Sequence, residues 1–168
     1  AEYDFTFAGA AGIKVDSGDG KVEIANNGLI NVAAYVYDQA DVYVATASAI
    51  GIDADGYSVS MTNAGDISAF ASNDVLLGNS IAIGINSDAT ADITISNTGD
   101  ISLAGSSGDG YARSGYYPNY VYFAGDFNGT GIRAVSTYGS ISVTNSGSIS
   151  ITDLNPVDGM SGSARSGD

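Results

Sequence analysis

Apolar and polar residues alternate along four short stretches of this chain, and the four stretches align with one another without gaps. Their shared pattern is apolar-x-apolar-x-Asn-x-Gly-x-Ile-x-apolar, and they cover residues 22–32, 59–69, 93–103 and 141–151. Alternation at a period of two is typical of β-strands, and the Gly marks a turn. Each copy therefore predicts a strand, a turn and a second strand.

A Gly-Ile pair stands eight to ten residues before each copy and predicts a third short strand: Gly12-Ile13, Gly51-Ile52, Gly84-Ile85 and Gly131-Ile132. The copies start 37, 34 and 48 residues apart, which indicates inserts between them. Further alternating segments within these gaps predict an additional strand in a matching row: 42–48, 80–83 and 120–123.

Three short strands cannot bury an apolar face by themselves, but stacked repeats can. Each strand would then pair with the matching strand of the next copy, which places like residues over like residues in parallel sheets. We therefore predict a single all-β domain over 1–168, a parallel β-helix (β-solenoid) of about four coils. The repeat cores are 12–32, 51–69, 84–103 and 131–151, and a Tyr-rich insert covers 104–130.

One turn position holds asparagine in all four copies: Asn26, Asn63, Asn97 and Asn145. If these side chains point inward, they can hydrogen-bond the turn backbone and one another as a ladder. The alternative is that asparagine merely tolerates a turn. Glycine follows two residues later, where a turn can require a positive φ: Gly28, Gly65, Gly99 and Gly147.

Gly-Ile-x-Ala followed by Val-x-Val-Thr-Asn-x-Gly-x-Ile-x-Ala resembles the repeats of bacterial autotransporter passengers and filamentous-haemagglutinin-like surface proteins, most closely over 132–151. The resemblance implies a right-handed parallel β-helix. It also implies export to the extracellular space or the bacterial outer cell surface, with roles in adhesion, aggregation or biofilm formation.

Charge narrows the range of partners. The chain carries 19 acidic and 5 basic residues, a net charge of −14, and its cations are scattered. No basic stripe exists to neutralise phosphates, which argues against nucleic-acid binding, and an anionic membrane would repel the chain. The sequence has no Cys and no His, which excludes thiol catalysis, disulfides and imidazole bases. No run of apolar residues is long enough for a membrane-spanning helix.

Aromatic residues gather in the segment 111–123, inside the longest insert. Tyrosine offers a large contact area at a low cost in entropy, and its ring faces suit sugars. The segment is a candidate for ligand contact or for assembly, and a loop that covers the solenoid flank is the alternative. Its candidate residues are Tyr111, Arg113, Tyr116, Tyr117, Tyr120 and Tyr122.

Two acidic, glycine-rich turns resemble calcium-binding turns and contribute Asp16, Asp19 and Asp109 as weak candidate ligands. Both lack the spacing of an EF-hand and the tandem nonapeptide of calcium-binding β-rolls, so ordinary solvated turns are the favoured interpretation. We expect no other cofactor.

Three functions fit this pattern. The favoured one is a non-catalytic surface protein, a rigid adhesin or structural rod whose partners are host glycans, host proteins or other copies of itself. The second is a self-assembling filament subunit that associates end to end or laterally. The third, a polysaccharide-cleaving β-helix enzyme, would need clustered carboxylates, whereas Asp53, Asp66 and Asp100 occur one per repeat.

Overall fold

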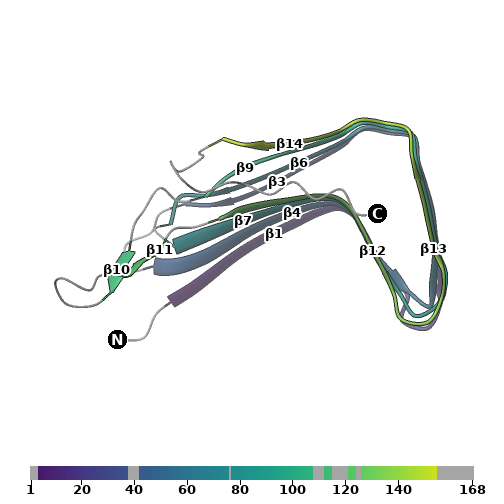
Figure 1. The fold of residues 1–168 in the computed structure, drawn as a ribbon, viewed down its shortest axis with the longest axis horizontal. Helices are drawn as coiled ribbons and strands as arrows, with labels where there is room; N and C mark the ends of the chain where they lie inside the picture. Colours follow the sequence, from purple (N-terminus) through teal and green to yellow (C-terminus); the bar gives the residue numbers. More distant parts are fainter. Residues whose placement is uncertain are drawn as a thin grey trace.

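The computed structural model describes residues 4–37, 42–75, 77–107, 112–114, 121–123 and 126–154. Strands and turns make up these segments, and no helix occurs in them. Figure 1 shows the path of the chain. The fold of the described residues is therefore all-β, as the sequence predicts.

Each repeat contributes three strands in the same order. The first strands are β1 (Asp4–Asp16), β4 (Val42–Gly56), β7 (Leu77–Ala89) and β12 (Phe127–Ser136). The second strands are β2 (Lys21–Asn26), β5 (Ser58–Asn63), β8 (Ile93–Asn97) and β13 (Ile141–Asn145). The third strands are β3 (Ile30–Val36), β6 (Ile67–Asn73), β9 (Ile101–Ser106) and β14 (Ile149–Asp153).

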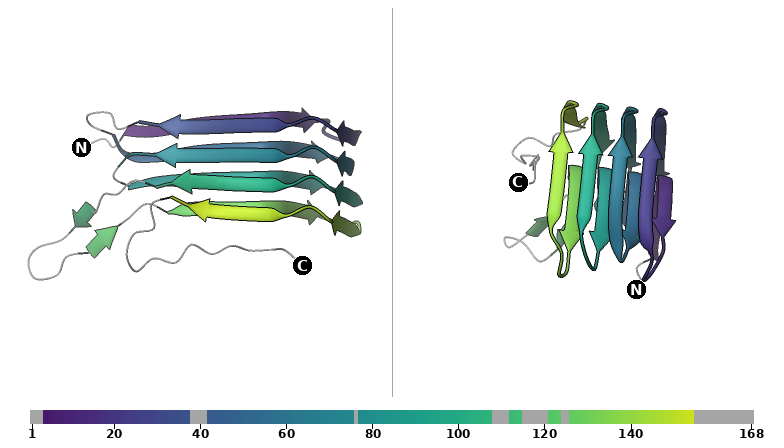
Figure 2. Two further views of the ribbon diagram at one scale, coloured as in Figure 1. Left: turned by 90° about the horizontal axis from the view of Figure 1, so that it is seen from above. Right: turned by 90° about the vertical axis from the view of Figure 1, so that its right-hand side faces the viewer.

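Matching strands of successive repeats lie side by side and form three four-stranded sheets, ordered β1-β4-β7-β12, β2-β5-β8-β13 and β3-β6-β9-β14. All neighbours within these sheets run parallel. Both views in Figure 2 show the four layers stacked along one direction. This arrangement confirms the predicted parallel stacking and is consistent with a β-solenoid.

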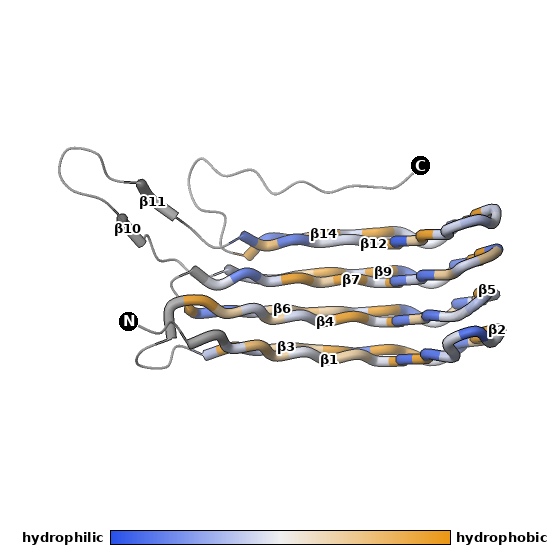
Figure 3. The backbone as a smooth tube through the Cα atoms, turned by 90° about the horizontal axis from the view of Figure 1, so that it is seen from below, coloured by the Kyte–Doolittle hydropathy of each residue, from blue (hydrophilic) through white to orange (hydrophobic). Residues whose placement is uncertain are grey.

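The registers between layers join equivalent residues of the repeat. Val22 lies opposite Val59, Val59 opposite Ile93, and Ile93 opposite Ile141. The third sheet aligns its isoleucines in the same way: Ile30, Ile67, Ile101 and Ile149. Figure 3 shows the resulting recurrence of hydrophobic positions at matching places in successive layers. Like side chains thus pack on like, so one repeat pattern builds every layer.

The first strand of each repeat is longer than the sequence pattern indicated. Val42–Gly56 is one continuous strand, so the segment 42–48 and the pair Gly51-Ile52 belong to the same element. Ser80 to Ile83 likewise lies within β7. The prediction of a separate short Gly-Ile strand is therefore wrong. Glycine does not end these strands, because the parallel pairing continues in the same register on both sides of Gly12, Gly51 and Gly84.

The prediction that segment 120–123 joins the same row of strands is also wrong. Val121–Phe123 forms β11, which pairs antiparallel with β10 (Ala112–Ser114) and not with the first sheet. The layer that follows β7 in that sheet is instead supplied by β12, where Phe127 lies opposite Ser80. β9 and β12 extend into the predicted insert 104–130, and the hairpin lies between them in the sequence.

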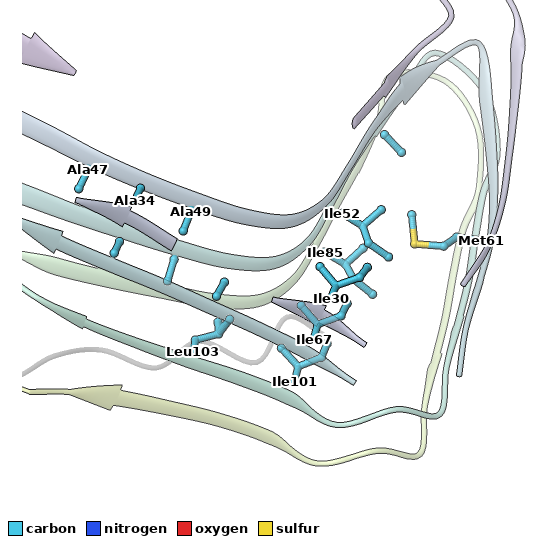
Figure 4. Close-up of a cluster of buried hydrophobic side chains, with 14 of the residues drawn as sticks. Ile30, Ala34, Ala47, Ala49, Ile52, Met61, Ile67, Ile85, Ile101 and Leu103 are labelled. Carbon is cyan, nitrogen blue, oxygen red and sulfur yellow. The ribbon is translucent and has the colours of Figure 1, made fainter. Parts of the chain in front are cut away.

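Small and large buried side chains occupy different parts of the core. Alanines such as Ala47, Ala49 and Ala34 lie where the first and third sheets run alongside each other, as Figures 1 and 4 show. Isoleucines and Met61 fill the wider corner beside the second sheet. Alanine lets two sheets approach closely, and each buried isoleucine contributes about 1.5–3 kcal/mol relative to exposure. The Gly- and Ala-rich composition is therefore sufficient to fill this narrow core.

One of the buried polar side chains in the described core has no hydrogen-bond partner. The Ser87 hydroxyl is fully buried and has no hydrogen-bond partner among the described residues. Ser87 lies in register between Ala54 and Ala134, so the neighbouring layers carry a methyl group at this position. An unpaired buried hydroxyl costs free energy that its packing does not recover.

We predict that Ser87→Ala raises the free energy of unfolding by about 1 kcal/mol, because it removes an unsatisfied hydroxyl without creating a cavity. Urea denaturation followed by circular dichroism measures the change. Ser80→Ala is the matched control, since the equally buried Ser80 Oγ donates to the Ser106 carbonyl at 2.6 Å. That control should destabilise the protein, and equal losses for both variants would contradict the assignment.

Candidate functional site

The four repeat asparagines form one hydrogen-bonded chain across the second sheet. They end β2, β5, β8 and β13 in register, and consecutive side-chain amides are joined at 2.7, 2.6 and 2.6 Å. Each Nδ2 also donates to the carbonyl two residues later, that of Gly28, Gly65, Gly99 or Gly147, at 2.7–2.8 Å. Asn63 and Asn97 are fully buried.

Both protons of an interior amide are used in this arrangement, one within its own turn and one toward the next layer. The chain also has a direction. Asn26 donates to Asn63, Asn63 to Asn97, and Asn97 to Asn145. Aspartate has the same shape but cannot donate these bonds. Asparagine therefore both closes each turn and ties it to the next.

The turn glycines serve a different purpose from the one predicted. None of the four repeat glycines has a positive φ; within the described segments that conformation occurs at Gly18, with φ at 55°. The prediction of a positive φ at the repeat glycines is therefore wrong. A Cβ on Gly65 would instead overlap the carbonyl of Gly28. Gly99 and Gly147 each lie against the glycine of the preceding layer in the same way. Close backbone stacking, and not turn conformation, requires glycine here.

A second glycine column stands in the first sheet. A Cβ on Gly51 would overlap both the Ile67 side chain and the backbone of Gly84. Gly12, Gly84 and Gly131 likewise lie against an isoleucine of the third sheet. The missing side chain makes room for the isoleucine column of the facing sheet.

Turn aspartates connect neighbouring layers on the outside. Asp92 accepts hydrogen bonds from the Ser140 backbone N–H at 2.8 Å and from its hydroxyl at 2.9 Å. Asp100 accepts from the Ser148 N–H at 2.8 Å. Hydrogen bonds from Ser140 hold the pKa of Asp92 below the usual value of 3.8, and hydrogen bonds from Ser148 do the same for Asp100. In both cases the backbone N–H contributes more than the side chain.

A row of polar groups crosses the outer face of the first sheet. Lys14 contacts Asp53 at 2.7 Å, and Asn86 donates to Asp53 at 2.8 Å. Arg133 reaches both Asn86 and Asp88. Burial of Asp53 favours its neutral form, but the hydrogen bonds from Lys14 and Asn86 outweigh burial and lower its pKa. Solvent screens such a row, so its contribution to stability is modest.

Exposed aromatic residues gather on the outer face of the third sheet. The rings of Tyr35 and Tyr37 are stacked, with centroids 6.0 Å apart and planes within 5°. Phe70 lies beside Tyr35 at 5.4 Å with its ring tilted by 42°. Both tyrosines are exposed, so they present aromatic faces to solvent. This aromatic surface (Tyr35, Tyr37 and Phe70) was not among the contact residues selected from the sequence, because all three lie just beyond the aligned segments 22–32 and 59–69.

Most of the predicted Tyr-rich contact residues lie outside the described residues: Tyr111, Tyr116, Tyr117 and Tyr120. Arg113 and Tyr122 are register partners in the β10–β11 hairpin. The hairpin therefore brings the backbones of these two candidate residues together.

The candidate calcium ligands do not converge within the part of the chain that the structure describes. Asp16 accepts a hydrogen bond from the Gly18 N–H at 3.1 Å, which stabilises the turn containing Asp19. No group of three or more metal-ligating side chains occurs in the described segments, and Asp109 lies outside them. No helix in the described segments could cross a membrane.

Comparisons of the chain with protein-family models, curated proteins and solved structures find no match. The repeat geometry and the exposed surfaces are therefore the observations on which a function can be argued.

We predict that Asn97→Ala strongly destabilises the protein, because it removes the acceptor of one Asn63 amide proton and the donor to both the Gly99 carbonyl and the Asn145 Oδ1. Each buried group left unpaired costs roughly 1–3 kcal/mol. Urea denaturation measures the loss, and the exposed neighbour Thr98→Ala is the control, with an expected change below about 0.5 kcal/mol. Equal losses for the two variants would show that the amide chain contributes nothing specific.

The lowered pKa of Asp100 predicts a pH-dependent effect. A carboxylate whose pKa is lower in the folded state stabilises the protein above its unfolded pKa and loses this contribution as the pH falls through the folded value. Asp100→Asn should therefore be less stable than the natural protein at pH 7, and the difference should narrow as the pH falls below 3.8, the ordinary pKa of an aspartate.

Denaturant midpoints across this pH range measure the difference. Thr98→Ala, which removes no carboxylate, is the control, and its difference from the natural protein should not change with pH. A gap for Asp100→Asn that stays constant with pH would refute the assigned role of the carboxylate.

Proposed function

We propose that this chain is a non-catalytic structural rod of the extracellular space or bacterial outer cell surface, which displays contact surfaces for adhesion, aggregation or biofilm formation. We further propose that it is a right-handed β-solenoid of about four coils. Connections between parallel strands of one sheet are right-handed in nearly all proteins, which favours this hand. The repeat resemblance to autotransporter passengers and filamentous-haemagglutinin-like proteins supports the location.

The observation that carries the rod proposal is the continuous stacking of equivalent residues. The amide chain and the glycine columns connect every layer to the next, and the three sheets share the same repeat direction. Bending such a stack would break hydrogen bonds and backbone contacts in several columns at once. A stack of this kind holds whatever it displays at a fixed position and orientation.

The aromatic surface is the part of the described structure best suited to contact a partner. Its two tyrosines combine exposed ring faces with hydroxyl groups; Tyr35 lies in β3 and Tyr37 directly follows this strand. Aromatic faces pack against the apolar faces of sugar rings, and tyrosine binds with little loss of side-chain entropy. Host glycans and glycoproteins are therefore the proposed partners, with other copies of the chain as a second class.

The experiment uses latex beads coated with the purified chain. We expect them to bind a layer of mixed mammalian glycoproteins several-fold better than beads coated with albumin, and to clump with one another. The variant Tyr35→Ser/Tyr37→Ser should reduce binding while its circular dichroism spectrum stays unchanged. Thr62→Ala/Thr94→Ala, on the outer face of the second sheet, is the control. Coated beads that neither bind nor clump would refute the proposed function.

A further inference from the structure

The last repeat exposes the side chains that the inner repeats bury. Ile141, Val143 and Ile149 are 47%, 44% and 39% exposed. Their counterparts in the preceding layer, Ile93, Ile95 and Ile101, are at most 1% exposed. The difference arises because each interior layer is covered on both sides, whereas the last described layer has a neighbour on one side only. This end of the stack is an apolar surface shaped like every internal layer boundary.

Among the described strands, those at both ends of the stack have a paired neighbour on one side only. β12, β13 and β14 are edge strands at one end, and β1, β2 and β3 are edge strands at the other. Edge strands present a row of N–H and C=O groups that can pair with a further parallel strand. All three sheets reach their edge at the same layer, so one partner layer could satisfy all of them together.

The amide chain has complementary ends. Asn145 donates to the Gly147 carbonyl, and among the described residues its Nδ2 has no amide to donate to, unlike Asn97. At the opposite end, the Asn26 Oδ1 accepts from the Gly28 N–H and, among the described residues, from no side-chain amide, whereas the Asn63 Oδ1 accepts from the Asn26 amide. Within the described layers, an amide proton without an acceptor therefore stands at one end and an amide oxygen without an amide donor at the other.

Gly28 provides the most specific indication. Within the described structure the nearest atom to a Cβ at this position would be the Asn26 Oδ1 at 3.8 Å, so nothing there excludes a side chain. The equivalent glycines of later repeats are required because each lies on the carbonyl of the layer before it. Glycine at position 28 is explained in the same way if another layer lies on its open side.

We propose that the end formed by β12, β13 and β14 docks onto β1, β2 and β3 of a second copy of this chain. The interface continues the internal register, with Ser142 opposite Glu23 of the second copy and Asn145 opposite its Asn26. A head-to-tail contact of this kind leaves both outer ends open and propagates into a filament. This head-to-tail contact goes beyond the proposed function at the cell surface, because it does not depend on where the chain is located.

The net charge of −14 repels neighbouring copies, so assembly should strengthen as salt screens that repulsion. The first test is disulfide trapping at high salt, since the chain has no cysteine of its own. In the double variant Glu23→Cys/Ser142→Cys, the two sites within one chain are three layers apart, roughly 14 Å, too far for a disulfide. Between stacked copies they are direct neighbours.

Oxidation should therefore produce a ladder of dimers, trimers and longer species on a non-reducing gel. Ser60→Cys/Ser142→Cys is the matched control, because its two sites stay about two layers apart both within and between copies. That variant should remain monomeric. A ladder that is absent, equal in both variants or limited to dimers would overturn the head-to-tail register.

The second test is Gly28→Val, which adds a side chain where the isolated chain has room but the stacked neighbour does not. Sedimentation velocity should show that the natural chain forms larger species as concentration and salt rise. The variant should need at least about tenfold more protein for the same assembly, with an unchanged melting temperature. Asn27→Val is the control. The equivalent positions of the later repeats, 64, 98 and 146, carry side chains within the stack, so a side chain at position 27 should not block stacking.

A natural chain that stays monomeric at all concentrations and salt levels would overturn the proposal, and so would a Gly28→Val variant that assembles as readily as the natural chain. Failure here is separate from failure of the proposed surface function, because bead binding through the aromatic surface does not require the two ends to meet.

Discussion

Close contact between equivalent backbones of successive layers is the constraint on which the rest of the structure depends. Where two turns stack, the glycine of one lies on the glycine carbonyl of the layer before it, and no side chain fits between them. The adjoining asparagine uses its amide to join the same two layers. Once the turns are held at this spacing, the strands on either side have little freedom to pair in any other register. The isoleucine columns follow from that register.

This constraint also explains the composition. A layer needs only one inward residue in two, and much of the inward surface of the long first strands is alanine, such as Ala45, Ala47 and Ala49. Glycine at positions 51 and 84 admits the isoleucine methyl groups of the facing sheet. The buried isoleucines and Met61 fill the corner beside the second sheet (Figure 4). Acidic residues lie outside, where Asp92 and Asp100 accept hydrogen bonds from the next turn.

Much of this architecture could be predicted from the sequence because the repeat is visible at the asparagine turn. The parallel stacking and the alignment of Val22 with Val59 and Ile93 follow from it. The long first strand could not be predicted in the same way, since the segments leading into Gly12, Gly51 and Gly84 share little sequence and glycine usually weakens a strand. The role of Gly65 was also misassigned, because a close approach between layers and a positive φ both select glycine, and only coordinates separate them. The aromatic surface was missed because the aligned repeat pattern ends at Val32 and Ala69, so Tyr35 and Phe70 lie just beyond the segments from which neighbours could be predicted.

The most direct test of the account is an NMR measurement on the side-chain amides of the repeat asparagines. The stacked arrangement predicts nuclear Overhauser effects between the amide protons of Asn63 and Asn97, together with slow exchange of these protons with solvent. It also predicts contacts between the methyl groups of Ile67 and Ile101. Rapidly exchanging asparagine amides without such contacts would show that the repeats do not stack in this register, and the account would be wrong.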